Sequence, residues 1–292
     1  MIERLSGILA TAWIITLFFV SFANAEKPDV FVSIVPQQYF LEKIAGEQVR
    51  VHVMVSPGAS PHTYEPKPGQ MRTLAGAVAY FSIGVTFEDA WLDKIRSASP
   101  DMKIIHTDRG IKKREINEGH GNSHDHSHGH GHGHGHADPH IWLSPPLVML
   151  QARNILEGLI MIDPDNREEY QANYQTFIRE IAELDVFLQN RLTPGTRFMV
   201  HHPSWGYFAD AYGLLQIPIE VEGKAPKARQ MQEVIRHARE QSIDSILVQP
   251  QFSTRDAETI AREIDGKTMI ADPLAANWAE NLKAVAELLE TR

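Results

Sequence analysis

The chain has 292 residues, no cysteine and a formal net charge of −9 at pH 7. Its hydrophobic share of 43% and charged share of 22% are those of an ordinary globular protein and argue against a disordered chain. The negative charge argues against a nucleic-acid partner. The lack of cysteine excludes a disulfide framework, a thiolate metal site and a lipid-bearing cysteine.

The first segment, residues 1–25, predicts a secretory signal peptide. An apolar run over 8–20 follows Arg4, and the small-residue pattern ANA at 23–25 is of the kind that signal peptidase cuts. A membrane anchor is the alternative, but the run is shorter than the about 20 apolar residues that cross a bilayer. We therefore expect a periplasmic protein without a membrane anchor in the mature chain, which begins near Glu26.

Residues 26–162 predict a first α/β lobe. The β-branched runs DVFVSIVP and VRVHVMVSP flank the helix-like QYFLEKIAG, and the alternation continues through AVAYFSIG, FEDAWLDKIRSA and KIIHTD. Strands that alternate with helices favour a mostly parallel sheet with helices on both faces. Residues 110–137 lose this periodicity to glycine, histidine and charge, which predicts a flexible insert. Order returns at DPHIWLSPP, where Ser144 is placed to cap a helix that runs to about Met161.

A long linking helix is predicted over residues 163–193. It begins with a capping aspartate and a proline, closes at Pro194, and carries one apolar face at a spacing of three and four residues. That face comprises Tyr170, Tyr174, Phe177, Ile178, Ile181, Leu184 and Leu188. Residues 194–292 repeat the alternation and predict a second α/β lobe. Two lobes joined by a rigid helix suggest a ligand-binding cleft between them.

Seven histidines lie outside the insert, and three of these suit structural or surface roles. His52 lies inside a predicted strand, His106 lies near the end of another, and His237 lies on a predicted helix close to arginines. We assign none of the three to a binding site.

The other four histidines and one aspartate lie at loop ends, where open α/β sheets bind ligands. His62 lies in a loop after a strand, and His140 lies just before a helix start. His201 and His202 end one strand of the second lobe, and Asp272 ends another. Three imidazoles and one carboxylate suit zinc, which usually takes four tetrahedral ligands. The spacing alone does not establish that these residues share one site.

Five separated motifs carry a resemblance to a known family. The segments PGASPHTYEPKPGQM, ADPHIWLSP, HPSWGYFADAYGL, VQPQFSTRDAETIAREI and ADPLAANWAENL resemble, in this order, the metal receptors of ABC transporters, which bind zinc or manganese in the periplasm. The resemblance runs from about Asp29 to the end of the chain. It implies two α/β lobes joined by one long rigid helix, with one metal in the cleft, and delivery of that metal to an inner-membrane ABC permease. We expect a monomer.

The resemblance also implies which residues bind the metal. The third ligand of the family stands just before the segment PSWGYF, which selects His202 over its neighbour. The implied site is therefore His62, His140, His202 and Asp272. Manganese receptors of the family usually carry a glutamate at the third position, so histidine there favours Zn²⁺ as the bound ion.

Three further residues bear on this expectation. Gln249 departs from the family pattern, in which a glutamate often precedes PQFS, but we do not assign that position to the metal. Glu65 and Glu222 lie near enough in sequence to support the ligands from behind. A capping or surface role for these two glutamates is the alternative.

The insert is predicted to assist the site. Its histidines alternate with glycine, inside the chain and between two family motifs, unlike a purification tag; a similar loop occurs in zinc-type members of the family. The histidines of the insert are His120, His124, His126, His128, His130, His132, His134 and His136. Flexible imidazoles bind metal weakly and exchangeably, and their tether near the site raises the local metal concentration. A passive linker is the alternative.

Three other functions remain open on the sequence. The first is a receptor of the same fold that binds manganese, iron or nickel. The second is a zinc hydrolase. The third is a periplasmic metal store that acts through the insert alone. A catalytic zinc usually keeps one position open for water and needs a base within reach, whereas four protein ligands close the site and no HExxH motif occurs. We therefore expect a zinc receptor and no enzyme.

Overall fold

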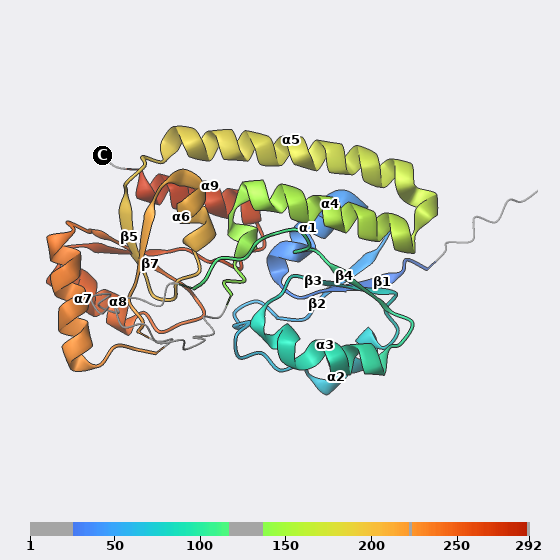
Figure 1. Cartoon of the computed structure of the whole chain (residues 1–292), viewed down its shortest axis with the longest axis horizontal. Coiled ribbons are helices and arrows are strands. Elements are labelled where there is room, and N and C mark those ends of the chain that lie inside the picture. Colours follow the sequence, from blue (N-terminus) through green and yellow to red (C-terminus); the bar gives the residue numbers. More distant parts are fainter. Residues whose placement is uncertain (1–25, 117–136, 222–223, 291–292) are drawn as a thin grey trace, which may run out of the picture.

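The computed structural model describes residues 26–116, 137–221 and 224–290, and the chain forms two α/β lobes side by side beneath one long helix (Figure 1). Each lobe contains a sheet of four parallel strands flanked by helices. This architecture confirms the predicted fold class. The predicted signal peptide and all eight histidines of the insert lie outside the described residues.

The first lobe is built on the sheet with strand order β2-β1-β3-β4. Its strands are β1 Asp29–Val32, β2 Arg50–Val53, β3 Ala79–Ser82 and β4 Lys103–His106. The helices between them are α1 Val35–Ala45, α2 Pro68–Leu74 and α3 Thr86–Ala98. The central strands β1 and β3 are apolar and almost wholly buried, because helices α2 and α3 lie on one side of the sheet and α1 on the other (Figure 1).

Local sequence signals account for the ends of these helices. Gly46 ends α1 with φ = 58°, a backbone conformation that favours glycine. Helix α2 was not predicted from the sequence, since Pro68 and Gly69 give its segment the composition of a loop. Pro68 occupies the first turn, where its missing N–H is not needed, and the Gln70 side chain accepts a hydrogen bond from Lys67 N–H at 3.0 Å.

The connection between the lobes is almost entirely helical. It comprises the 3₁₀ turn η1 Ile141–Leu143, helix α4 Pro145–Ile162, the 3₁₀ turn η2 Pro164–Asn166 and helix α5 Arg167–Arg191. At 25 residues, α5 is about 37 Å long at 1.5 Å per residue, and it runs along both lobes in Figure 1. Five of the seven apolar residues predicted for its inner face are buried; Tyr174 and Ile178 are partly buried.

The second lobe repeats the topology of the first, with strand order β6-β5-β7-β8. Its strands are β5 Arg197–Val200, β6 Leu215–Pro218, β7 Ser245–Val248 and β8 Lys267–Ile270. Its helices are α6 Gly206–Tyr212, α7 Ala228–Glu240, α8 Arg255–Glu263 and α9 Trp278–Leu289. In Figure 1, α7 and α8 lie on the outer side of this lobe, whereas α6 and α9 lie toward α4 and α5. No helix of the described residues is long and apolar enough to cross a membrane.

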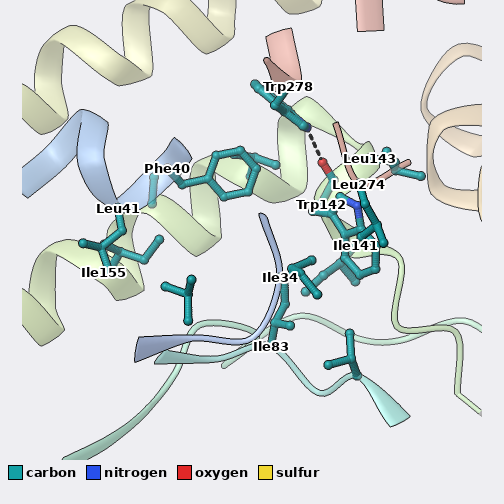
Figure 2. Close-up of a cluster of buried hydrophobic side chains, with 14 of the residues drawn as sticks. Ile34, Phe40, Leu41, Ile83, Ile141, Trp142, Leu143, Ile155, Leu274 and Trp278 are labelled. Carbon is teal, nitrogen blue, oxygen red and sulfur yellow. Dashed lines mark hydrogen bonds between the residues drawn. The ribbon is translucent and has the colours of Figure 1, made fainter. Parts of the chain in front are cut away.

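One hydrophobic core continues from the first lobe into the second. Figure 2 shows its centre, where Phe40 of α1 and Trp278 of α9 lie near Trp142 of η1. Two indole hydrogen bonds tie this centre together: Trp278 Nε1–H donates to Trp142 O, and Trp142 Nε1–H donates to Pro273 O, each at 2.7 Å. The loops that carry His140 and Asp272 are therefore joined through buried indole groups.

Candidate metal centre

Three histidines from three separate loops meet between the two sheets. His62 lies between β2 and α2, His140 immediately precedes η1, and His202 lies two residues beyond the end of β5. One ligand atom from each histidine lies within 4.8 Å of the other two. The ring centroids are 4.7 to 5.4 Å apart. Three imidazoles at this spacing could hold one metal ion, and imidazole is a common ligand of zinc.

Each of the three rings has a hydrogen-bond partner at Nδ1, on the side that leaves Nε2 available. The three contacts are His62 Nδ1 to Thr86 Oγ1 at 3.1 Å, His140 Nδ1 to Asp138 Oδ1 at 2.7 Å, and His202 Nδ1 to Glu220 Oε1 at 2.6 Å. A carboxylate only accepts, so His140 and His202 donate from Nδ1, and in the neutral form of either ring the lone pair is then on Nε2. The Nε2 atom of His202 is buried and has no hydrogen-bond partner among the residues that the structure describes. Outer partners of this kind fix the orientation and tautomer of metal-binding histidines.

The rings border a small cavity of about 20 Å³. A volume of this size holds about one water or one ion. Its lining comprises Ser60, Pro61, His62, His140, Trp142, His202, Ser204, Gln249, Gln251, Phe252, Pro273 and Leu274. The lining places apolar side chains beside the imidazoles, and the His202 ring stacks on Phe252 with centroids 5.6 Å apart. The cavity suits one bare cation.

The surroundings favour neutral imidazoles. Burial, together with the neighbouring His140 and His202, lowers the pKa of His62 from 6.5 to about 3. Burial also lowers the pKa of His140, against the opposing effect of Asp138. Neutral imidazole is the form that binds a metal ion, so these two ligands need not lose a proton when the ion arrives at neutral pH.

Comparison with known proteins identifies the family. The sequence model described as "ZnuA: Zinc-uptake complex component A periplasmic" matches residues 30–291. The chain belongs to this family.

Individual members of the family resemble the chain over most of its length. A crystal structure of ZnuA is 45% identical, covers 90% of this chain and 97% of its own, and superposes with a TM-score of 0.81. An internal deletion mutant of ZnuA with zinc bound is 44% identical, with coverage of 91% and 99% and the same TM-score.

Two curated relatives are more distant in sequence. The high-affinity zinc uptake system protein ZnuA of Bacillus subtilis is 29% identical over 86% of this chain and 80% of its own. The zinc-binding protein AdcA of Streptococcus pyogenes serotype M3 is 27% identical over 88% of this chain. This chain spans about half the length of that streptococcal relative, 52%.

Asp272 lies outside the group of converging ligand atoms. Its Oδ1 accepts hydrogen bonds from Gln251 Nε2 at 2.7 Å and from Leu274 N–H at 2.9 Å. The two residues that follow it, Pro273 and Leu274, line the cavity. Within the described residues, the converging group therefore consists of the three histidines, and the predicted aspartate lies beside it.

The two supporting glutamates named in the sequence analysis are placed differently. Glu65 is exposed on the loop between β2 and α2 and does not belong to the converging group. Glu222 lies outside the described residues. His201 is buried beside Phe252, with ring centroids 5.1 Å apart, and is not one of the converging ligands.

The residues that hold the imidazoles were missed, although two carried a signal. Asp138 stands two residues before His140, close enough for its carboxylate to accept both the backbone N–H, at 3.0 Å, and the ring N–H. Glu220 follows from the strand register. Val200 of β5 pairs with Pro218 of β6, so His202 and Glu220, each two residues beyond, emerge side by side. Thr86, at the start of α3, carried no such signal.

Proposed function

We propose that this chain captures Zn²⁺ and hands it to the permease of an ABC transporter. The observation that carries the proposal is the convergence of His62, His140 and His202 on a cavity of about 20 Å³. An all-imidazole group suits zinc better than manganese, which favours oxygen ligands. The family supports the same function, since its description and its zinc-bound member concern zinc uptake and zinc binding.

The site binds metal rather than turning over a substrate. A catalytic zinc keeps a position open for water and for the reacting group. The cavity here has about 20 Å³, enough for about one water, and its lining includes Trp142, Phe252, Pro273 and Leu274. This size suits one bound ion better than an ester, phosphoester or peptide beside it.

We propose Asp272 as the fourth ligand. Its backbone lies next to two cavity-lining residues, and its carboxylate would offset part of the ion's double charge. Oδ1 already accepts from Gln251 Nε2 and Leu274 N–H, so the carboxylate would bind the ion either by exchanging these hydrogen bonds or by turning Oδ2 toward the cavity. Asp272→Ala should weaken zinc binding, and Asp101→Ala, at an exposed position before β4, is the matched control.

Titration of the metal-stripped protein tests the function. We expect one tight zinc and weaker manganese binding in a variant that lacks residues 119–136. His140→Ala should weaken zinc binding by more than the about 10–100-fold typical of outer partners. His106→Asn, at an exposed position at the end of β4, should bind as the parent does. Equal zinc affinity of the His140→Ala variant and the parent would contradict the proposal that the three histidines bind the ion.

Two further features belong to the proposal. We propose that the chain works in the periplasm as a monomer and that the histidines of the insert supply weak, exchangeable zinc sites. Sedimentation of the purified chain tests the first. Zinc stoichiometry of the chain with and without residues 119–136 tests the second. The deletion should remove only the weak zinc sites of the insert, which should lose their metal first as the pH falls through about 6.

A further inference from the structure

The structure describes the two ends of the insert, which pair with each other next to the three histidines. Glu115 and Ala137 form an antiparallel bridge, and Asp138 N–H donates to Arg114 O at 2.8 Å. Asp138 is also the acceptor for the ring and backbone N–H groups of His140. Asp138 therefore belongs to the base of the insert and also accepts the ring hydrogen bond of His140.

The Arg114 guanidinium lies between the lobes. Its Nη1 is 2.8 Å from Asp210 Oδ2 on α6, and its Nε is 3.7 Å from Asp138 Oδ2. The Arg114 side chain is 24% exposed and that of Asp138 is 2% exposed, so the pair is largely removed from water. Helix α6 begins four residues after His202. Arg114 therefore connects the holder of His140 to the helix that follows His202.

Two residues of α6 complete this junction. The Tyr207 hydroxyl accepts from Arg114 N–H and donates to Asp138 O, each at 2.9 Å. Gly206 makes room for the guanidinium, because a Cβ there would lie 2.6 Å from Arg114 Nη1 and 3.1 Å from Asp138 Oδ2.

The buried carboxylate explains why the arginine is needed. An ionised carboxylate that is almost fully buried is costly unless it is paired and hydrogen-bonded. The two oxygens of Asp138 have separate partners, with Oδ1 on His140 and Oδ2 facing Arg114. Without the guanidinium, Oδ2 loses its cation, and the carboxylate no longer has a fixed plane in which to hold the imidazole.

We propose that Arg114 is a positioning residue of the metal centre, which holds Asp138 on His140 and sets the spacing of His140 and His202 across the two lobes. The inference rests on the proposed function. Substitution of outer partners of metal-binding histidines typically costs about 10–100-fold in affinity. The same loss is expected when Arg114 is replaced by methionine, which keeps an unbranched apolar stem and removes the guanidinium with its charge and its hydrogen-bond donors.

The test compares two arginines of one segment. Arg114→Met should bind zinc about 10-fold or more weakly than the parent. Arg109→Met is the matched control, because Arg109 pairs with Glu157 at an exposed position away from the cavity. Gly206→Ala should act in the same direction as Arg114→Met, since its methyl group displaces the guanidinium while keeping the charge.

A second readout separates positioning from folding. In the zinc-loaded protein, the Nδ1 proton of His140 gives an NMR resonance that reports its hydrogen bond to Asp138. We expect this resonance to shift and to exchange faster with water in Arg114→Met and to stay unchanged in Arg109→Met. Equal zinc affinity of these two variants overturns the inference, and so does a lower affinity with an unchanged resonance. If the parent protein does not bind zinc tightly, the proposed function itself fails.

Discussion

At the scale of single residues, each imidazole of the centre depends on one hydrogen-bond partner behind it. Glu220 is 5% exposed and accepts a hydrogen bond from His202 Nδ1 at 2.6 Å, whereas Glu65 is exposed and lies outside the converging group. The two glutamates therefore differ in function although both lie close in sequence to site loops. A carboxylate behind a ligand raises the basicity of the imidazole and fixes its orientation.

The difference between Glu220 and Glu65 gives a direct prediction. Glu220→Gln keeps the shape of the side chain but removes its charge, so zinc affinity should fall by about 10-fold, at the lower end of the effects of outer partners. Glu65→Gln should bind zinc as tightly as the parent. Competition titration against a zinc chelator measures both, and a loss in the Glu65→Gln variant would contradict the assignment of Glu65 to the surface.

His62 makes the metal-free protein less stable in acid. Its pKa of about 3 in the folded chain lies below the 6.5 of the free side chain, because the site is buried and contains two other imidazoles. Between these values the unfolded chain binds a proton that the folded chain does not, so lowering the pH from about 7 to about 4 favours unfolding. Denaturant titration should show a shallower pH dependence for His62→Gln than for the parent. Parallel curves would show that His62 is not held neutral.

At the scale of elements, the indole hydrogen bonds join the ligand loops. Trp142→Phe removes the N–H that Pro273 O accepts and leaves a buried carbonyl without this donor. An unsatisfied buried group of this kind costs about 1–3 kcal/mol. We expect the free energy of unfolding to fall by that amount. Trp91→Phe, at a partly buried position on α3, is the control, and a similar loss there would mean that the indole area rather than the hydrogen bond matters.

Most elements were predictable because their sequence patterns are local. The apolar face of α5 and the β-branched strands determined the two lobes, and Gly46 was placed correctly as the end of α1. Helix α2 was missed because a seven-residue helix with Pro68 and Gly69 has no apolar repeat. The outer partners were missed because their contacts depend on how strands align. His202 meets Glu220 only when β5 and β6 pair in this register.

At the scale of the whole molecule, the core that spans both lobes predicts one unfolding transition. Leu184 of α5 is 3% exposed in this core, whereas Val186, two residues on, is 55% exposed. Leu184→Ala should lower the free energy of unfolding by about 2–5 kcal/mol, and Val186→Ala should change it by about 0.5 kcal/mol or less. Circular dichroism and tryptophan fluorescence should give coincident curves in both variants. Separate transitions would mean that the lobes unfold independently.

The size of the cavity also bears on how many waters an ion at the three rings would keep. The cavity has space for about one water, so an ion bound by all three nitrogens would keep few of its own waters. Magnesium gives up its water reluctantly and prefers six oxygen ligands, and calcium takes six to eight oxygens. An ion that keeps its waters therefore fits these three nitrogens poorly, which would make dehydration part of how the site selects its ion.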